Sequence, residues 1–208
     1  RRAFASGALT AGPGWMALIV GMLAVAVWAT WLAINAAAAL FLFLGAFTYA
    51  VIYTVVLKRR TWLNIVFGGL AGSFAVLTGA AAADPGIGTL PLLLALVLFL
   101  WTPPHFWSLA IACRDDYARA GVPMLPVVMG TERAARIVHG NAWLLVAASL
   151  LPALFGAGPI YLVAALAGGA HFLRHTGALS RDPQRSTAMR AFFASMVQLA
   201  VLVAGVGA

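Results

Sequence analysis

Two adjacent carboxylates, Asp115 and Asp116, are the clearest candidates for chemistry in a chain that has only five acidic residues among 208. They follow a long apolar stretch and directly precede Tyr117. Carboxylate oxygens, together with substrate phosphates, are the ligands that Mg²⁺ prefers. The pair therefore predicts a Mg²⁺ site for a phosphorylated substrate. The alternative is a solvated loop in which Arg114 and Arg119 neutralise the two carboxylates.

Three consecutive cations, Lys58, Arg59 and Arg60, follow another apolar stretch. Arginine offers bidentate hydrogen bonds to phosphate oxygens, and lysine supplies a compact positive charge. If they lie on the same side of the molecule as the carboxylates, these residues could bind a diphosphate. The alternative is that they are only the basic flank of a membrane-spanning helix, which requires no ligand.

His105 lies within an apolar stretch, directly after Pro103 and Pro104. Ionisable residues inside a membrane are candidates for functional sites, and two prolines should kink a helix and free carbonyl groups. On a regular helix His105 and Asp116, which are 11 residues apart, lie about 20° from the same face. The spacing predicts a pocket that runs from His105 to the carboxylates. The alternative is a histidine that only hydrogen-bonds a freed carbonyl.

Small residues recur at a spacing of four in the stretch that begins at Asn64, where Gly68 pairs with Gly72 and Gly69 with Ser73. Such pairs let two membrane helices approach closely. Close helix packing is the main interpretation, and a glycine-floored groove for a flat or bulky ligand is the alternative.

The composition indicates which elements must position these residues. The chain is 63% hydrophobic and 9% charged, which excludes a water-soluble globule because so little polar surface could not cover it. One cysteine, Cys113, excludes a disulfide scaffold. Apolar windows near 20 residues, without the alternation of barrel strands, predict an all-α polytopic membrane protein. We expect seven transmembrane helices, at 13–33, 35–57, 64–83, 87–112, 137–155, 157–173 and 188–206.

The basic residues test this topology. With the N-terminus on the positive side, all 13 lysines and arginines fall on one side of the membrane, and the opposite loops carry only Asp84. The net charge of +8 is thereby explained by basic loops, and no nucleic-acid partner is expected. Two long inner loops, 113–136 and 174–187, are the expected place for function.

Several segments of the chain resemble a known family. Trp101-Thr-Pro-Pro-His-Phe-Trp and the following Asp-Asp-Tyr-Ala-Arg-Ala-Gly-Val-Pro-Met-Leu-Pro are similar to the protohaem IX farnesyltransferase (haem O synthase) family of UbiA-type intramembrane prenyltransferases. Two further segments are similar to that family. The family's inner loop resembles Tyr53-Thr-Val-Val-Leu-Lys-Arg-Arg-Thr, and the stretch that opens its third helix resembles the segment from Arg2. The resemblance extends over all 208 residues.

The resemblance implies a nine-helix bundle that transfers a farnesyl group from farnesyl diphosphate to a vinyl group of haem B. The product is haem O for terminal oxidases. The chain would then be one membrane domain, 1–208, that lacks the family's first two helices and first aspartate-rich motif, and this piece alone should be inactive. A bacterial inner membrane with the active site on the cytoplasmic side is expected. The expected partners are the lipid bilayer and either haem A synthase or oxidase assembly factors.

The same resemblance and the electrostatics of diphosphate ionisation suggest a role for each candidate residue. Asp115 and Asp116 are expected to hold Mg²⁺, with Lys58 and Arg2 on the phosphate oxygens. His105 is assigned to haem, as an axial or propionate contact. The remaining substrate-binding candidates are Tyr53, Arg59, Asn64, Arg114 and Tyr117, and Trp101, Phe106 and Trp107 are candidate liners of an apolar tunnel.

The sequence departs from the wider superfamily in one respect, because neither Asp115 nor Asp116 is followed four residues later by a second aspartate. The number of Mg²⁺ ions is therefore left open. Three other functions are alternatives: a prenyltransferase with another aromatic acceptor, a non-enzymatic assembly protein, and a transporter. The histidine motif argues against another acceptor, and a single deeply placed ionisable residue argues against a transporter.

Overall fold

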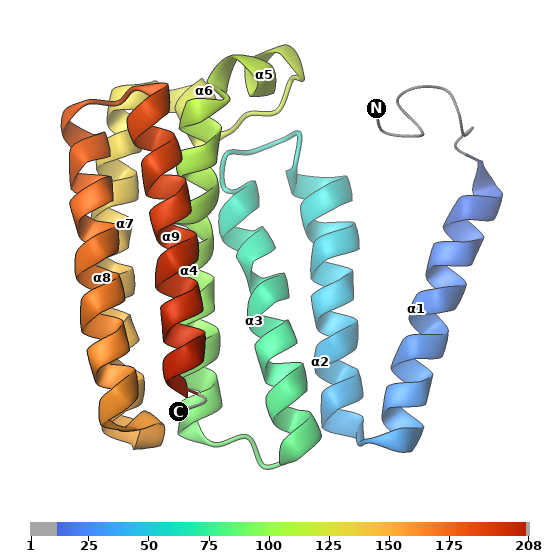
Figure 1. Ribbon diagram of the computed structural model, residues 1–208. Coiled ribbons are helices and arrows are strands. Elements are labelled where there is room, and N and C mark those ends of the chain that lie inside the picture. Colours follow the sequence, from blue (N-terminus) through green and yellow to red (C-terminus); the bar gives the residue numbers. More distant parts are fainter. Residues whose placement is uncertain (1–11, 207–208) are drawn as a thin grey trace.

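The computed structural model describes residues 12–206, and every regular element in that part of the chain is a helix (Figure 1). The all-α prediction is confirmed. The elements are α1 (Pro13–Ala33), α2 (Ala36–Phe47), η1 (Thr48–Leu57), α3 (Asn64–Ala83), α4 (Thr89–Ala112), α5 (Arg114–Arg119), α6 (Leu125–Met129), α7 (Thr131–Pro152), η2 (Ala153–Ala157), α8 (Gly158–Arg181) and α9 (Arg185–Val206).

Six continuous helical runs within residues 12–206 are long and apolar enough to cross a membrane, rather than the seven separate helices that were expected. The difference lies in one run, Thr131–Arg181, which contains α7 and α8. The chain reverses within η2, where Gly156 has a φ of 105°, a conformation that side chains other than glycine rarely adopt. Because α7 and α8 lie antiparallel (Figure 1), this one run accounts for two of the expected helices.

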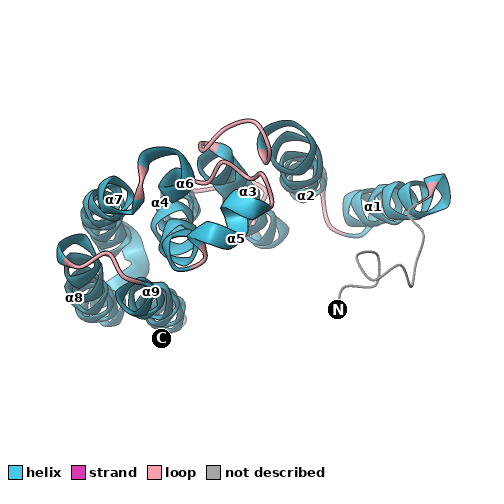
Figure 2. Ribbon diagram, turned by 90° about the horizontal axis from the view of Figure 1, so that it is seen from above, coloured by secondary structure: helices cyan, strands magenta, loops and turns pink. Residues whose placement is uncertain are grey.

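The helices form two differently packed regions. Helices α4, α7, α8 and α9 form a compact group, whereas α3, α2 and α1 continue from it as a row in which α1 lies outermost (Figure 2). None of the residues of α1 is buried, and α2 buries only Ala38 and Ala39. The compact group thus forms most of the core, and the row presents much of its surface to lipid.

Small residues on α3 allow α3 and α4 to approach closely. A Cβ added at Gly69 would lie 3.1 Å from the Thr102 side chain, and one added at Gly72 would lie 3.3 Å from Leu98. Ser73 donates a hydrogen bond of 2.9 Å to the carbonyl of Ala95. Helix packing is therefore the role of Gly69, Gly72 and Ser73, whereas Gly68 lines a small cavity.

Asn35 joins α2 to α3 at the end of the bundle away from α5. Its side-chain oxygen accepts the N–H of Ala38 at 2.8 Å and so caps α2. Its amide nitrogen donates to the carbonyl of Ala81 at 2.7 Å, at the end of α3. One side chain thus satisfies a backbone donor on α2 and a backbone acceptor on α3, which an apolar environment requires.

The predicted inner loops are largely helical. Helix α8 extends to Arg181 and α9 begins at Arg185, so the expected loop 174–187 is wrong and only residues 182–184 connect the two helices. The segment 113–136 contains α5, α6 and the first turn of α7. The hydropathy windows end before the helices do, because arginine and histidine near a membrane surface lower the mean hydropathy of the window. The helix itself continues, since these long side chains can extend to water from it.

Positive charge gathers at one end of the bundle, as predicted. The chain order and the antiparallel helices place residues 58–63, 113–130 and 182–184 at the same end, and 34–35, 84–88 and η2 at the other (Figure 1). Every lysine and arginine within the described residues lies at or near the first end, and Asp84 lies at the second. The helices therefore bring the two predicted charged segments to one surface.

Candidate active site

The carboxylate pair lies on a short helix of its own. Helix α4 ends at Ala112, because Cys113 leaves helical geometry with φ −116° and ψ 28°, and α5 begins at the next residue. Asp115 and Asp116 occupy the first turn of α5, where the positive end of the helix dipole favours negative charge. Both side chains are exposed and line a cavity of about 420 Å³.

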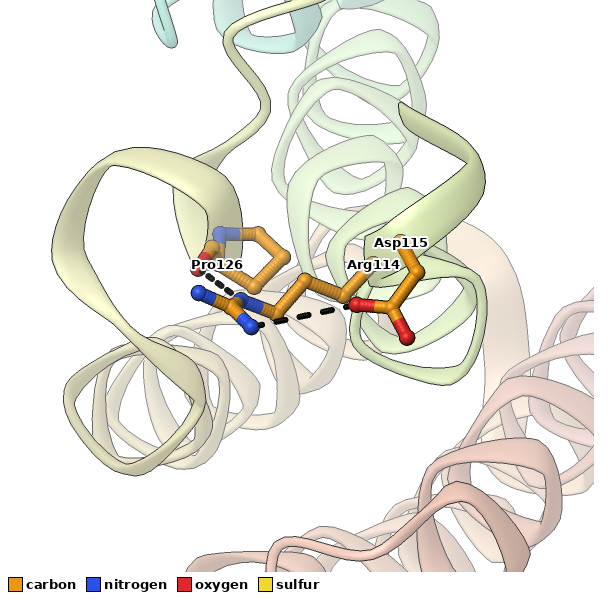
Figure 3. A network of polar contacts seen from close by, with 3 residues as sticks. All are labelled: Arg114, Asp115 and Pro126. Atoms are coloured by element: carbon orange, nitrogen blue, oxygen red, sulfur yellow. Dashed lines mark hydrogen bonds and ion pairs between the residues drawn. The ribbon is translucent and has the colours of Figure 1, made fainter. Parts of the chain in front are cut away.

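Arginine side chains surround the two carboxylates. Arg114 donates from Nε to the carbonyl of Pro126 at 3.1 Å, and its Nη1 lies 3.9 Å from Asp115 Oδ1 (Figure 3). Arg119 contacts Asp116 three residues earlier on the same helix. The pairing with arginine that the sequence offered as an alternative is thus present, and exposed pairs of this kind are weak enough for a ligand to displace.

Tyr117 lies on the inner side of α5. It is half-buried and packs, together with Tyr53 and Trp62, against one apolar cluster that includes Ile65 and Trp107. Burial, and then the charge of nearby Cys113, raise the pKa of the Tyr117 phenol above its ordinary value, so that it stays protonated and can donate a hydrogen bond. The cluster supports both α5 and the loop that carries Lys58.

The basic loop 58–63 is held in place by its own backbone. The N–H of Lys58 donates to the carbonyl of Tyr53 at 2.8 Å, which continues the wide turn of η1. Asn64 is fully buried and donates to the carbonyl of Lys58 at 3.2 Å, while its Oδ1 has no partner. Arg59 is exposed. Asn64 therefore positions the loop, and its predicted substrate contact stays a prediction.

Tyr53 lines a second, smaller cavity of about 150 Å³ between neighbouring helices, and Tyr49 and Phe106 on its walls are partly exposed. Its walls come from η1, α3 and α4, and they are Tyr49, Tyr53, Ile65, Gly68, Thr102 and Phe106. A Cβ at Gly68 would lie 2.9 Å from the Tyr53 ring, so glycine permits this ring position. Phe106 borders this cavity, whereas Trp101 and Trp107, the other two candidate tunnel liners, are buried elsewhere in the core. Thr102 and Phe106 precede the end of α4 by about 9–15 Å.

His105 is a contact between α4 and α9. Its Nδ1 lies 2.7 Å from the hydroxyl of Ser195, and its ring is stacked between Trp101 at 4.1 Å and Phe192 at 4.5 Å. Trp101 in turn donates from Nε1 to the carbonyl of Ser195 at 2.8 Å. These contacts favour a structural role. The haem contact predicted for His105 stays a prediction.

Two expectations for His105 are wrong. It does not share a helix face with Asp116, because the chain leaves helical geometry at Cys113 and the second residue lies on α5. The alternative that His105 hydrogen-bonds a carbonyl freed by the prolines is also not observed, since its partner is Ser195 on another helix. Spacing along the sequence predicts which residues share a helix face only where the helix is unbroken.

The structure brings Arg114, Asp115 and Asp116 into one cavity and places Tyr53 in another, while Lys58 and Arg59 line neither of them. The prediction for Arg2 falls outside the described residues. The lining residues that the sequence analysis missed include Tyr49, which lies one helical turn before Tyr53, and Thr131 and Arg185, which join α5 from α7 and α9. Aromatic spacing could have indicated Tyr49, but no local pattern connects residue 185 with residue 115.

The residues at α5 fit the expected Mg²⁺ ion in one respect and limit it in another. Within residues 12–206 no group of three or more histidine, cysteine or acidic residues could hold a metal by itself. Mg²⁺ is usually bound by one or two carboxylates together with substrate phosphates and waters, and Asp115 and Asp116 provide such a pair. The described residues therefore suit an ion that arrives with a diphosphate rather than a closed metal site.

The fold and the site define an intramembrane prenyltransferase. The model of the UbiA prenyltransferase family matches residues 1–197, so the chain belongs to this family. It also resembles a solved structure from work on digeranylgeranylglyceryl phosphate synthase in membranes, with a TM-score of 0.74 over 90% of this chain and 66% of the other. The sequence identity is 17%, so this likeness concerns the fold alone.

Within the family, the similar proteins are protoheme IX farnesyltransferases. The chain is 57% identical to Protoheme IX farnesyltransferase 2 of Paramagnetospirillum magneticum, over 99% of this chain and 71% of that protein. Its identity to Protoheme IX farnesyltransferase 1 of the same organism is 52%, over 97% and 71%. An enzyme of the same name from Cenarchaeum symbiosum is 43% identical, over 83% of this chain and 58% of that protein. The family resemblance inferred from the sequence is thus confirmed.

Proposed function

We propose that the protein transfers a farnesyl group from farnesyl diphosphate to a vinyl group of protohaem IX, which gives haem O. The observation that carries this proposal is a cavity with two carboxylates and three arginines at the basic end of an apolar bundle. The chain in which it occurs is 57% identical to a protoheme IX farnesyltransferase. A soluble diphosphate can reach this end from water, while the apolar farnesyl chain lies among the helices.

The diphosphate would be bound at the surface of this end. Lys58 and Arg59 would contact its phosphate oxygens from the loop that Asn64 holds, and Arg2 would join them. Asp115 and Asp116 would hold Mg²⁺, and Tyr117 would donate a hydrogen bond. A Mg²⁺ ion bound there would neutralise the negative charge that develops on the leaving diphosphate. Arg114 keeps α5 attached to α6 through the carbonyl of Pro126 while the charges of the site change.

The reaction breaks the bond between C1 of the farnesyl group and the diphosphate oxygen, and pyrophosphate leaves with the electron pair. A bond then forms between C1 and the terminal vinyl carbon, and the positive charge passes to the inner vinyl carbon. Water adds there and releases a proton. The aromatic cavity of Tyr49, Tyr53 and Phe106 suits the first isoprene unit, because aromatic faces stabilise a nearby cation and a narrow cavity excludes early attack by water.

We place the protein in the bacterial cytoplasmic membrane, with the basic end on the cytoplasmic side. The gathering of lysine and arginine at one end of the bundle supports this orientation. Single-cysteine variants Asp84→Cys and Asp116→Cys in sealed vesicles test it, because a membrane-impermeant maleimide should label them from opposite sides. Labelling of both from one side contradicts the topology. Haem A synthase or oxidase assembly factors are the partners that would receive the product.

The full-length protein, purified and reconstituted in liposomes, tests the activity. With farnesyl diphosphate, protohaem and Mg²⁺ it should form farnesylated haem and pyrophosphate in equal amounts, detected by mass spectrometry. Chelation of divalent cations should stop the reaction, and added Mg²⁺ should restore it. A phenolic quinone precursor in place of protohaem should give no product. Prenylation of that precursor but not of protohaem would contradict the proposal.

A further inference from the structure

The cavity beside α5 has more positive than negative charge among its lining residues. Arg114 and Arg119 each lie beside one carboxylate, so these four charges are matched. Arg185, the first residue of α9, lines the same cavity and has no ion-pair partner among residues 12–206. One cation in the cavity is therefore available to an anion that comes from outside.

The backbone that carries Arg185 is well defined. Only three residues, 182–184, separate α8 from α9. The Thr187 hydroxyl lies 2.6 Å from the carbonyl of Asp182 and accepts the N–H of Gln184 at 3.1 Å. Helix α9 is fixed to α4 by the hydrogen bond from Trp101 to the carbonyl of Ser195. The start of α9 also contributes the positive end of a helix dipole of 22 residues.

The position of Arg185 differs from that of the other candidate cations. Seen from above, α9 and the loop that connects α2 with α3 lie on different sides of α5 (Figure 2). Lys58 and Arg59 lie on that loop and do not line the cavity that Arg185 lines. The carboxylate pair is therefore placed between two basic regions, and the reaction has two anionic substrates. The loop with Lys58 and Arg59 suffices for the diphosphate, and Arg185 at the start of α9 remains for the acceptor.

We infer that Arg185 binds a propionate of the acceptor and thereby sets its orientation. The inference rests on the proposed function, because protohaem carries two propionates on one edge and its vinyl groups on the opposite side of the macrocycle. With the propionates at Arg185 on the membrane surface, the vinyl groups point into the apolar interior. The aromatic cavity that suits the first isoprene unit lies between η1, α3 and α4, about 9–15 Å from the end of α4 toward the middle of the bundle.

Steady-state kinetics of Arg185→Ala in the full-length reconstituted protein test the inference. We expect the KM for protohaem to rise about tenfold, which is the usual effect of removing one charge-assisted hydrogen bond, while the KM for farnesyl diphosphate changes less than twofold. Protohaem titration followed by absorbance should show the same loss in affinity. Arg185→Lys should restore part of it. The matched control is Arg181→Ala, at the end of α8 and outside the cavity lining, which should behave as the wild type.

Protohaem dimethyl ester, which has no carboxylate, separates binding of the propionate from a general effect. The ester should bind the wild type about tenfold more weakly than protohaem does, and wild type and Arg185→Ala should bind it equally. A defect of Arg185→Ala that persists with the ester, a higher KM for farnesyl diphosphate, or an unchanged KM for protohaem each overturns the inference. If the wild type forms no farnesylated haem, it is instead the proposed function that fails.

Discussion

The compact group of α4, α7, α8 and α9 differs from the row of α1, α2 and α3 in what holds it together. In the group, buried side chains and hydrogen bonds between helices, such as that from Trp101 to Ser195, act in addition to backbone packing. In the row, α1 buries no residue and α3 depends on glycines to approach α4. The carboxylates lie on α5, which directly follows α4 of the group, and the basic loop belongs to the row. The site therefore combines segments attached to two differently packed regions.

The largest effect should come from the carboxylates, and it should leave the helical group intact. Asp116→Asn in the full-length protein removes a ligand of the proposed Mg²⁺ ion and should lower farnesyl transfer about 100-fold or more, which corresponds to several kcal/mol of transition-state stabilisation. The melting temperature should not change. Haem O formation in membranes measures the activity. Asp84→Asn, at the opposite end of the bundle, is the control, and full activity of Asp116→Asn would rule out the role.

Replacing a glycine by a large side chain should destabilise the protein by different amounts at two positions, one in each region. A Cβ at Gly169 on α8 would lie 2.7 Å from Val146 on α7, whereas nothing lies within 4 Å of one at Gly79 on α3. Gly169→Leu should cost about 2–3 kcal/mol, roughly 5–10 °C in melting temperature, and Gly79→Leu less than about 0.5 kcal/mol. Thermal unfolding in detergent measures both. Equal losses would contradict the difference in packing between these two positions.

Replacement of His105 tests whether this residue only stabilises the compact group or also contacts haem. His105→Ala removes the hydrogen bond to Ser195 and the stacking on Trp101 and Phe192, and should cost about 1–3 kcal/mol. We expect a lower melting temperature with an unchanged Soret band and unchanged haem affinity. The exposed His171→Ala serves as control. A shifted Soret band would instead support His105 as a haem contact.

The smallest effect is expected in the row, at the aromatic cavity. Gly68→Ala places a methyl group 2.9 Å from the Tyr53 ring and should displace that ring into the cavity. The KM for farnesyl diphosphate should rise about threefold to tenfold, or roughly 1 kcal/mol, with little change in melting temperature. Gly79→Ala, on the open side of the same helix, should leave both unchanged. If only the KM for protohaem changed, the farnesyl chain would not bind in this cavity.

Much of this architecture could be predicted from the sequence, because lipid imposes a simple rule on long apolar segments. The passes, their direction and the common end of Lys58 and Asp116 follow from hydropathy and charge. The break at Cys113 could not be predicted, since nothing in Ala-Cys-Arg-Asp-Asp prevents a helix from continuing. The contact of His105 with Ser195, 90 residues away, and the presence of Arg185 beside α5 depend on tertiary packing, which local spacing does not contain.

Asn35 has a consequence for the accuracy of the site at the far end of the same helices. A slip of α2 along α3 by one helical turn would move the Lys58 loop about 5.4 Å along the membrane normal. Such a slip would leave the carbonyl of Ala81 without the Asn35 donor and α2 without its side-chain cap, so both hydrogen bonds oppose it. A single amide thus sets the vertical alignment of the two helices, and the depth at which a diphosphate can be held is determined from the opposite surface of the membrane.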